Sequence, residues 1–107
     1  MQTVTLNTEE APNKFWAYRD ASMRNAVNSS LYSAKTRVQA ERMKLACELV
    51  YSAKEVYIAF GKRGISIKVD GARVRDRKEL ALLEQEWAQQ GVTKKVSAQG
   101  VLYRFVA

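Results

Sequence analysis

The spacing of the hydrophobic residues changes near residue 55, and this change restricts the fold more than any other feature of the sequence. Before it, apolar residues recur at the intervals of an α-helix, and after it large apolar residues recur at every second position as in a β-strand. Helices followed by strands predict the α+β class. A chain of 107 residues suits a single hydrophobic core. We therefore expect one domain over 1–107, with N-terminal helices packed on a mainly antiparallel sheet.

Residues 13–53 carry the helical pattern, and residues 1–12 are expected to be flexible or to form a short strand. One unbroken helix over 13–53 would be about 60 Å long, whereas a compact domain of this size has a radius of gyration of about 13 Å. The polar run 28–30 (Asn-Ser-Ser) suits a helix start. This favours two helices, over about 14–27 and 31–53. A continuous helix that protrudes and packs on another copy is the alternative.

The second of these helices has a wide apolar face formed by two stripes. The first stripe consists of Leu31, Ala34, Val38, Leu45 and Leu49, and the second of Tyr32, Met43 and Val50. Lys35 and Arg42 project between the stripes. Their methylene groups either cover apolar surface while the charges stay in water, or the two cations line a groove for a phosphate or a carboxylate.

Alternating residues after position 55 predict a β-hairpin with strands 56–60 and 65–69. Its loop is Gly61-Lys62-Arg63-Gly64, in which the glycines allow a tight reversal. Asp70-Gly71 then predicts a turn into a third strand around Val74. These strands would form a three-stranded meander.

A helix inserted into the sheet is predicted over 77–90, between the meander and the C-terminal strands. Asp76 precedes Glu79 by three residues, as in a capping box, and Gly91 suits the helix end. Its Leu80, Leu83 and Trp87 share one face, which we expect to be buried.

The C-terminal segments 92–96 and 101–106 predict a second hairpin. Both faces of the last strand are largely apolar. This strand is therefore expected inside the sheet or against a second subunit.

The composition offers little for catalysis. There is no histidine, and the lone Cys47 has no partner for a disulfide or a zinc site. Asp70 and Asp76 serve a turn and a helix cap, while Glu84 and Glu86 point in different directions on one helix. We predict that the protein is not an enzyme and needs no cofactor or metal. One free cysteine, no signal peptide and no membrane-spanning apolar run favour the reducing cytoplasm.

Positive charge is the feature that indicates a ligand. Eighteen Lys and Arg outnumber eleven Asp and Glu, for a net charge of +7. The candidate contacts are Lys62, Arg63, Lys68, Arg73, Arg75, Arg77, Lys78, Lys94, Lys95 and Arg104. If these side chains converge on the sheet and its rim, they would bind nucleic-acid phosphates in a salt-dependent way. Tyr57 shares a predicted sheet face with Lys68 and could stack an unpaired base, although a solvated sheet face would look the same.

An acidic protein surface is the alternative partner. Small basic domains without catalytic groups also act as inhibitors or adaptors, of the type encoded by phages and mobile elements, that dock on a larger protein or nucleoprotein complex. An exposed apolar anchor such as Trp16, Leu82 or Leu102 would indicate this mode, and a scattered surface residue is the competing explanation. The extensive apolar surface also favours a homodimer over burial within the monomer.

Overall fold

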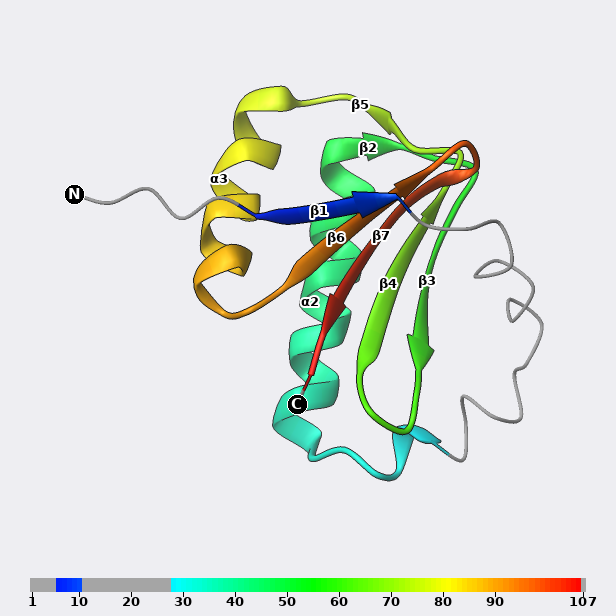
Figure 1. Ribbon diagram of the computed structural model, residues 1–107, viewed down its shortest axis with the longest axis vertical. Coiled ribbons are helices and arrows are strands. Elements are labelled where there is room, and N and C mark those ends of the chain that lie inside the picture. Colours follow the sequence, from blue (N-terminus) through cyan, green and yellow to red (C-terminus); the bar gives the residue numbers. More distant parts are fainter. Residues whose placement is uncertain (1–5, 11–27, 107) are drawn as a thin grey trace.

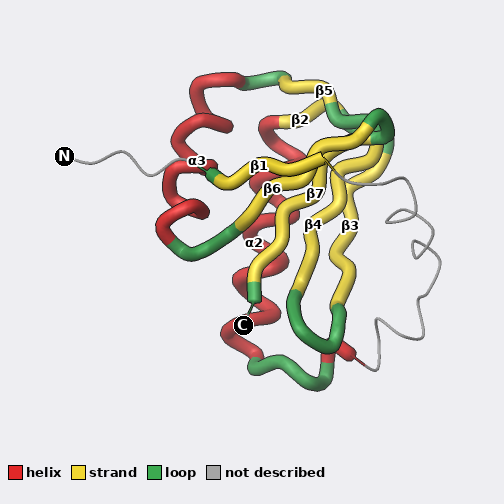
Figure 2. The backbone as a smooth tube through the Cα atoms, viewed as in Figure 1, coloured by secondary structure: helices red, strands yellow, loops and turns green. Residues whose placement is uncertain are grey.

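The structure of the protein is a computed structural model that describes residues 6–10 and 28–106. Two complete helices within these residues pack on a mainly antiparallel sheet, which confirms the α+β class (Figures 1 and 2). The helix predicted over 14–27 lies outside the described residues. Among the described residues, no helix has both the length and the apolar character that crossing a bilayer requires.

Five strands form the main sheet, in the order β1-β6-β7-β4-β3. Their bounds are β1 Asn7–Glu10, β3 Glu55–Phe60, β4 Ile65–Asp70, β6 Thr93–Ser97 and β7 Gly100–Phe105. All neighbours are antiparallel except β1, which runs parallel to β6. Both predicted hairpins, β3–β4 and β6–β7, are confirmed. A strand within residues 1–12 is also present, as β1.

Strand β7 lies inside the sheet, between β6 and β4. Its Val101, Leu102, Tyr103 and Phe105 are all buried. The prediction that this two-sided apolar strand is interior is therefore confirmed, and the strand needs no second subunit to cover it.

The predicted three-stranded meander is wrong, because the strand after Gly71 leaves the main sheet. This strand, β5 (Arg73–Val74), pairs with β2 (Tyr51–Ser52) in a separate two-stranded sheet. Strand β7, which starts at Gly100, pairs with β4 instead. A Cβ atom on Gly100 would lie 2.0 Å from the carbonyl oxygen of Val69. Close approach of β7 to β4 thus depends on a residue without a side chain.

We expect Gly100→Ala to destabilise the fold by at least about 2 kcal/mol, because the new methyl group would collide with backbone atoms that cannot rotate away. Gly91→Ala is the matched control. Gly91 has φ +81° and open space around it, so alanine there should cost only about 1–2 kcal/mol in backbone strain. Urea unfolding would measure both, and equal losses would contradict the role assigned to Gly100.

Helix α2 is shorter than the predicted range of 31–53 and covers Ala34–Val50. Ser33, rather than the 28–30 run, caps it, since its Oγ accepts a hydrogen bond from the Thr36 backbone N–H at 3.2 Å. At the other end, Tyr51 turns to extended backbone because it pairs with Val74 in the β2–β5 sheet. The helical spacing of the apolar residues continues past both ends of α2, which is why the predicted helix was too long.

The apolar face predicted for α2 is only partly correct. Its buried residues are Ala40, Met43, Cys47 and Val50. The first predicted stripe points away from the core instead, leaving Val38, Leu45 and Leu49 exposed by 49%, 55% and 72%. The core selects the side with Ala40 and Cys47, because their small side chains let the helix approach the strands closely.

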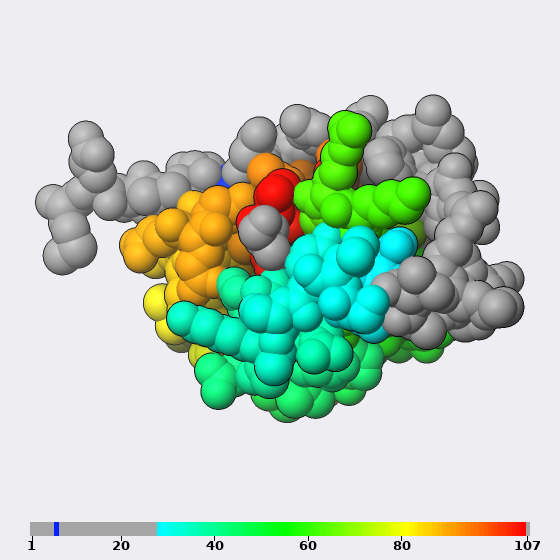
Figure 3. All heavy atoms as spheres, turned by 90° about the horizontal axis from the view of Figure 1, so that it is seen from below, coloured from blue at the N-terminus to red at the C-terminus, as the bar shows by residue number. Residues whose placement is uncertain are grey.

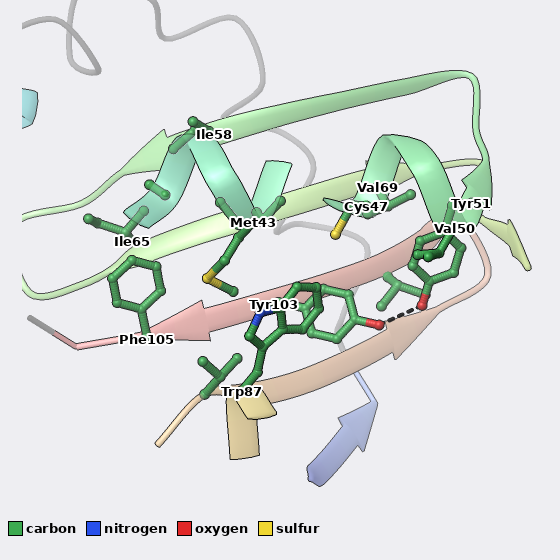
Figure 4. Packing of buried hydrophobic residues seen from close by; sticks show 14 of the residues in the cluster. Met43, Cys47, Val50, Tyr51, Ile58, Ile65, Val69, Trp87, Tyr103 and Phe105 are labelled. Atoms are coloured by element: carbon green, nitrogen blue, oxygen red, sulfur yellow. Dashed lines mark hydrogen bonds between the residues drawn. The ribbon is translucent and has the colours of Figure 1, made fainter. Parts of the chain in front are cut away.

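Helix α3 covers Arg77–Gln89 and agrees closely with its prediction. Asp76 Oδ1 accepts a hydrogen bond from the Glu79 N–H at 3.0 Å, and Gly91 follows the helix with positive φ. Leu80 and Trp87 are buried. Trp87 packs edge-on against Tyr103 with ring centroids 5.0 Å apart, in the core that α2, α3 and the sheet share (Figure 4).

Candidate nucleic-acid interface

The predicted cations do not converge on one surface. Lys62 and Arg63 are exposed in the loop that joins β3 to β4, and the segment 73–78 follows the far end of β4 (Figure 1). Six residues of β4 separate the two groups, which corresponds to about 20 Å along a strand. The expectation of one positive surface along the sheet is therefore not met, and each group has to be considered by itself.

Lys94 is mostly covered by neighbouring side chains and makes contacts within the protein. Lys94 and Val96 lie on the same face of β6, and Lys94 is the strand partner of Tyr103 on β7. Its Nζ lies 2.8 Å from Glu84 Oε2 and 5.8 Å from the centroid of the Tyr103 ring. An ion-paired ammonium group over a buried ring is not available to an external phosphate. Lys94 is therefore withdrawn from the candidate contacts.

Lys68 is also buried. The strand register places Tyr57 opposite Lys68 and Ala59 opposite Ser66, so the predicted sheet face is confirmed. Lys68 Nζ lies 5.8 Å from the centroid of the Tyr57 ring, and burial lowers the pKa of this lysine. Tyr57 is half-buried and already contacts this cation. The pair thus forms an internal contact, which does not suit the role predicted for it in phosphate binding and base stacking.

Lys95 and Arg104 lie on the same face as Lys68, on β6 and β7, and both are half-buried. The guanidinium of Arg104 lies against Gly64, where a Cβ atom would be 2.8 Å from Nη2. Leu102 on that face is buried and is therefore not an exposed anchor, contrary to its candidacy. Leu82 on α3 is 62% exposed, as an anchor would be, while Trp16 lies outside the described residues.

The four remaining cations form what we call the basic segment: Arg73, Arg75, Arg77 and Lys78. All four are exposed. The backbone that carries them is held in place, because the N–H groups of Arg75 and Asp76 both donate to the Val50 carbonyl, at 2.7 and 3.2 Å. Arg75 Nη2 also donates to the Tyr51 carbonyl at 3.1 Å. The four exposed cations thus lie on a backbone that hydrogen bonds fix to the C-terminal end of α2.

Two cations of the basic segment occupy an electrostatically unfavourable place. Arg77 and Lys78 are the first two residues of α3. The N-terminus of a helix carries partial positive charge, and a charged side chain there changes the stability by about 0.3–1 kcal/mol, with cations on the unfavourable side. Folding stability therefore does not explain their placement. An anionic ligand would, because the helix end adds to the positive potential of the side chains.

A buried polar network was missed by the sequence reasoning. The hydroxyls of Tyr51 and Tyr103 are hydrogen-bonded at 2.5 Å, and Tyr103 also donates to Glu84 Oε2 at 2.6 Å (Figure 4 shows the first bond). The signal lay in the spacing: Glu84 follows the buried Leu80 by one helical turn, and Lys94 follows the buried Val92 by two residues, which places it on the same side of the chain. Polar residues of opposite charge at such positions indicate a partly buried pair.

This network is structural in character. Burial raises the pKa of Tyr51 to about 12, and burial, Tyr51 and Glu84 together raise the pKa of Tyr103 further. Both hydroxyls are therefore protonated near neutral pH and act as hydrogen-bond donors. Tyr103 is fully buried, so its hydroxyl serves contacts within the protein.

We expect Tyr103→Phe to lower the free energy of unfolding by about 1–3 kcal/mol, because Glu84 and Tyr51 each lose a partner. A double-mutant cycle with Glu84→Gln should show a coupling of about 0.5–3 kcal/mol in chemical denaturation. Glu86→Gln, at an exposed position of the same helix, should stay within about 0.5 kcal/mol of the wild type. Additive effects of the first two changes would contradict a shared network.

Cys47 is a free, fully buried cysteine on α2. Burial first, then the charges of Glu84 and Glu48, raise the pKa of its thiol from 9.0 to about 12. A thiol that stays protonated is a poor nucleophile. The interpretation of Cys47 as a small core residue agrees with this environment.

The raised thiol pKa predicts a loss of stability at alkaline pH. Above pH 9 the unfolded thiol ionises while the folded thiol stays protonated up to about pH 12. Each pH unit in this window should therefore cost about 1.4 kcal/mol. Urea unfolding at several pH values would show a shallower decline for Cys47→Ala than for the wild type. Identical declines would show that the thiol titrates normally in the folded protein.

A comparison of the chain with known protein families, curated proteins and solved structures finds no match. Function is therefore inferred from the chemistry and geometry of the residues.

Proposed function

We propose that this protein is a non-enzymatic module that binds nucleic-acid phosphates through the basic segment, Arg73, Arg75, Arg77 and Lys78. The observation that supports this most is the exposure of four cations within six residues on a backbone held by Val50. A rigid display loses little conformational entropy on binding. Long cationic side chains on such a support are typical of phosphate contacts.

The contacts would be made to the backbone of the nucleic acid and would read little sequence. Residues 73–78 include no aromatic residue that would stack a base, and the one apolar residue among them, Val74, belongs to β5. Affinity would therefore depend steeply on salt, because counterions are released from the phosphates. The buried free thiol of Cys47 suits the reducing cytoplasm that we assign to this function.

A protein target has separate support. Val38, Leu45 and Leu49 on α2 and Leu82 on α3 are exposed, and such residues act as anchors in protein interfaces. An inhibitor or adaptor would use this apolar surface, and so would a second copy of the chain in a homodimer. Residues 73–78, by contrast, contain one apolar residue, Val74, and suit a polyanion better than an apolar protein surface.

The test is the triple variant Arg73→Ala, Arg77→Ala and Lys78→Ala. Arg75 is kept because its guanidinium holds the Tyr51 carbonyl. Anisotropy of labelled single-stranded and duplex oligonucleotides should show weaker binding. The slope of log K against log salt should fall by about one for each phosphate that the variant no longer binds. The wild type is expected to bind at low salt, about 50 mM, and failure to bind any oligonucleotide there would reject the proposal.

Lys62→Ala with Arg63→Ala is the control, which removes two positive charges instead of three, since these cations are also exposed and lie at the other end of the hairpin. Their removal should leave affinity within about twofold at moderate salt, because they lie beyond a Debye length from the basic segment. The triple variant should also be at least as stable as the wild type, since cations at the start of α3 oppose the helix dipole. Equal weakening by both variants would show attraction by net charge alone.

A further inference from the structure

A groove lies between α2 and α3, two helices whose surfaces adjoin in the view from below (Figure 3). The N-terminal half of α2 and the C-terminal half of α3 form its walls, with a volume of 660 Å³. Met43, Leu83 and Trp87 contribute apolar surface. Gln39 and Gln90, which also line it, are joined by a side-chain hydrogen bond of 3.0 Å that links the two helices.

An exposed apolar stripe continues from this groove along α2. Val38 lines the groove, and Leu45 and Leu49 follow it by seven and eleven residues, on the same side of the helix. All three are at least 49% exposed. Single exposed leucines are common, but a row of them at helical spacing beside an apolar groove is the pattern of a surface that receives a partner helix.

The charges beside the stripe show which partner it suits. Lys35 and Arg42 line the groove on the α2 side and are exposed. Neither forms an ion pair with another residue in the part of the chain that the structure describes. The wall on the α3 side carries Glu86. Glu41 and Glu48 lie on the other edge of the stripe, where Lys44 is paired with Glu48 and also faces the charge of Glu41. The edge of α2 that borders the groove therefore attracts carboxylates, whereas the α3 side does not.

We propose that this groove and stripe bind an acidic amphipathic helix of another protein. Apolar residues of that helix, at intervals of three and four, pack on Val38, Leu45 and Leu49 and enter the groove toward Trp87. Its carboxylates face Lys35 and Arg42, which together with Glu86 orient it across the groove. This surface differs from the basic segment, so the inference does not depend on nucleic-acid binding.

A second copy of this chain is the weaker candidate for the surface. Each copy carries a net charge of +7, so two copies repel each other at low salt. An incoming α2 would also bring its own Lys35 and Arg42 to the stripe. That helix carries four cations against two carboxylates, Glu41 and Glu48, and Glu48 is already paired with Lys44 at 2.9 Å. The observed charges thus favour an acidic partner.

The experiment selects the partner chemistry directly. Helices as long as α2, 17 residues, are displayed on yeast with leucine fixed along one face and Glu, Lys or Gln allowed at every flanking position. The full-length protein is the bait. Selection should enrich Glu, and an enriched peptide should bind at least about tenfold more tightly than its Lys counterpart. No enrichment, or equal enrichment of Glu and Lys, would overturn the proposal.

Charge reversal supplies the matched controls. Lys35→Glu with Arg42→Glu should switch the selection from Glu to Lys. Lys62→Glu with Arg63→Glu changes the net charge equally and should leave the preference for Glu intact; a switch here would mean that net charge alone decides. The triple variant of the basic segment should bind the selected peptide normally. Failure of that variant to bind the peptide would place the site elsewhere.

The apolar contact and the competing homodimer are tested together. Val38→Gln with Leu45→Gln should weaken the selected peptide at least about tenfold, and unchanged affinity would contradict a contact with the stripe. Sedimentation should show a monomer for the wild type. A wild-type dimer that the same double variant dissociates would show that a second copy covers the stripe and would overturn the acidic-helix proposal.

Discussion

The close packing of α2 on the sheet is the constraint on which the other features depend. Ala40 and Cys47 are fully buried, and their small side chains bring the helix axis near the strands. Val50 ends the helix inside the core, and its carbonyl accepts the backbone bonds that hold the basic segment. The position of α2 therefore determines where the four exposed cations lie and where α3 begins.

The same packing explains why the molecule has an exposed apolar surface. The helix carries apolar residues on two sides, and only one side can contact the sheet. Burying Ala40, Met43 and Cys47 turns Val38, Leu45 and Leu49 outward. Exposed leucines are unfavourable for solubility and provide nothing to the core. The partner helix proposed above would cover these side chains.

Features set by neighbouring residues could be predicted from the sequence. The cap at Asp76 and the strand alternation of both hairpins are local, and they agree with the structure. The partner of β5 could not be predicted, because it depends on Gly100, which lets β7 rather than β5 lie beside Val69. Which side of α2 is buried could not be predicted either. Hydrophobicity alone favours burial of Leu45 over Ala40, but in the fold Ala40 is buried and Leu45 is exposed.

The same limit applies to the candidate site. A list of cations says nothing about their neighbours, and Lys94 could be removed from it only because Glu84 and Tyr103 lie beside it in the fold. Lys68 was removed by its burial. The cations of the basic segment stay available because they lie outside the main sheet, on β5 and on the first residues of α3. Cations at the ends of elements and in connections thus stay exposed, whereas cations on strands inside the sheet become covered.

The two proposed sites use different sides of one helix. The stripe of Val38, Leu45 and Leu49 lies on the exposed outer side of α2, whereas the basic segment is attached at Val50, whose side chain is buried in the core. Leu49 and Val50 are neighbours at the end of α2, so a partner helix that covers the whole stripe would end close to the basic segment. If both sites are occupied, the protein would therefore hold an acidic protein and a nucleic acid next to each other on one helix.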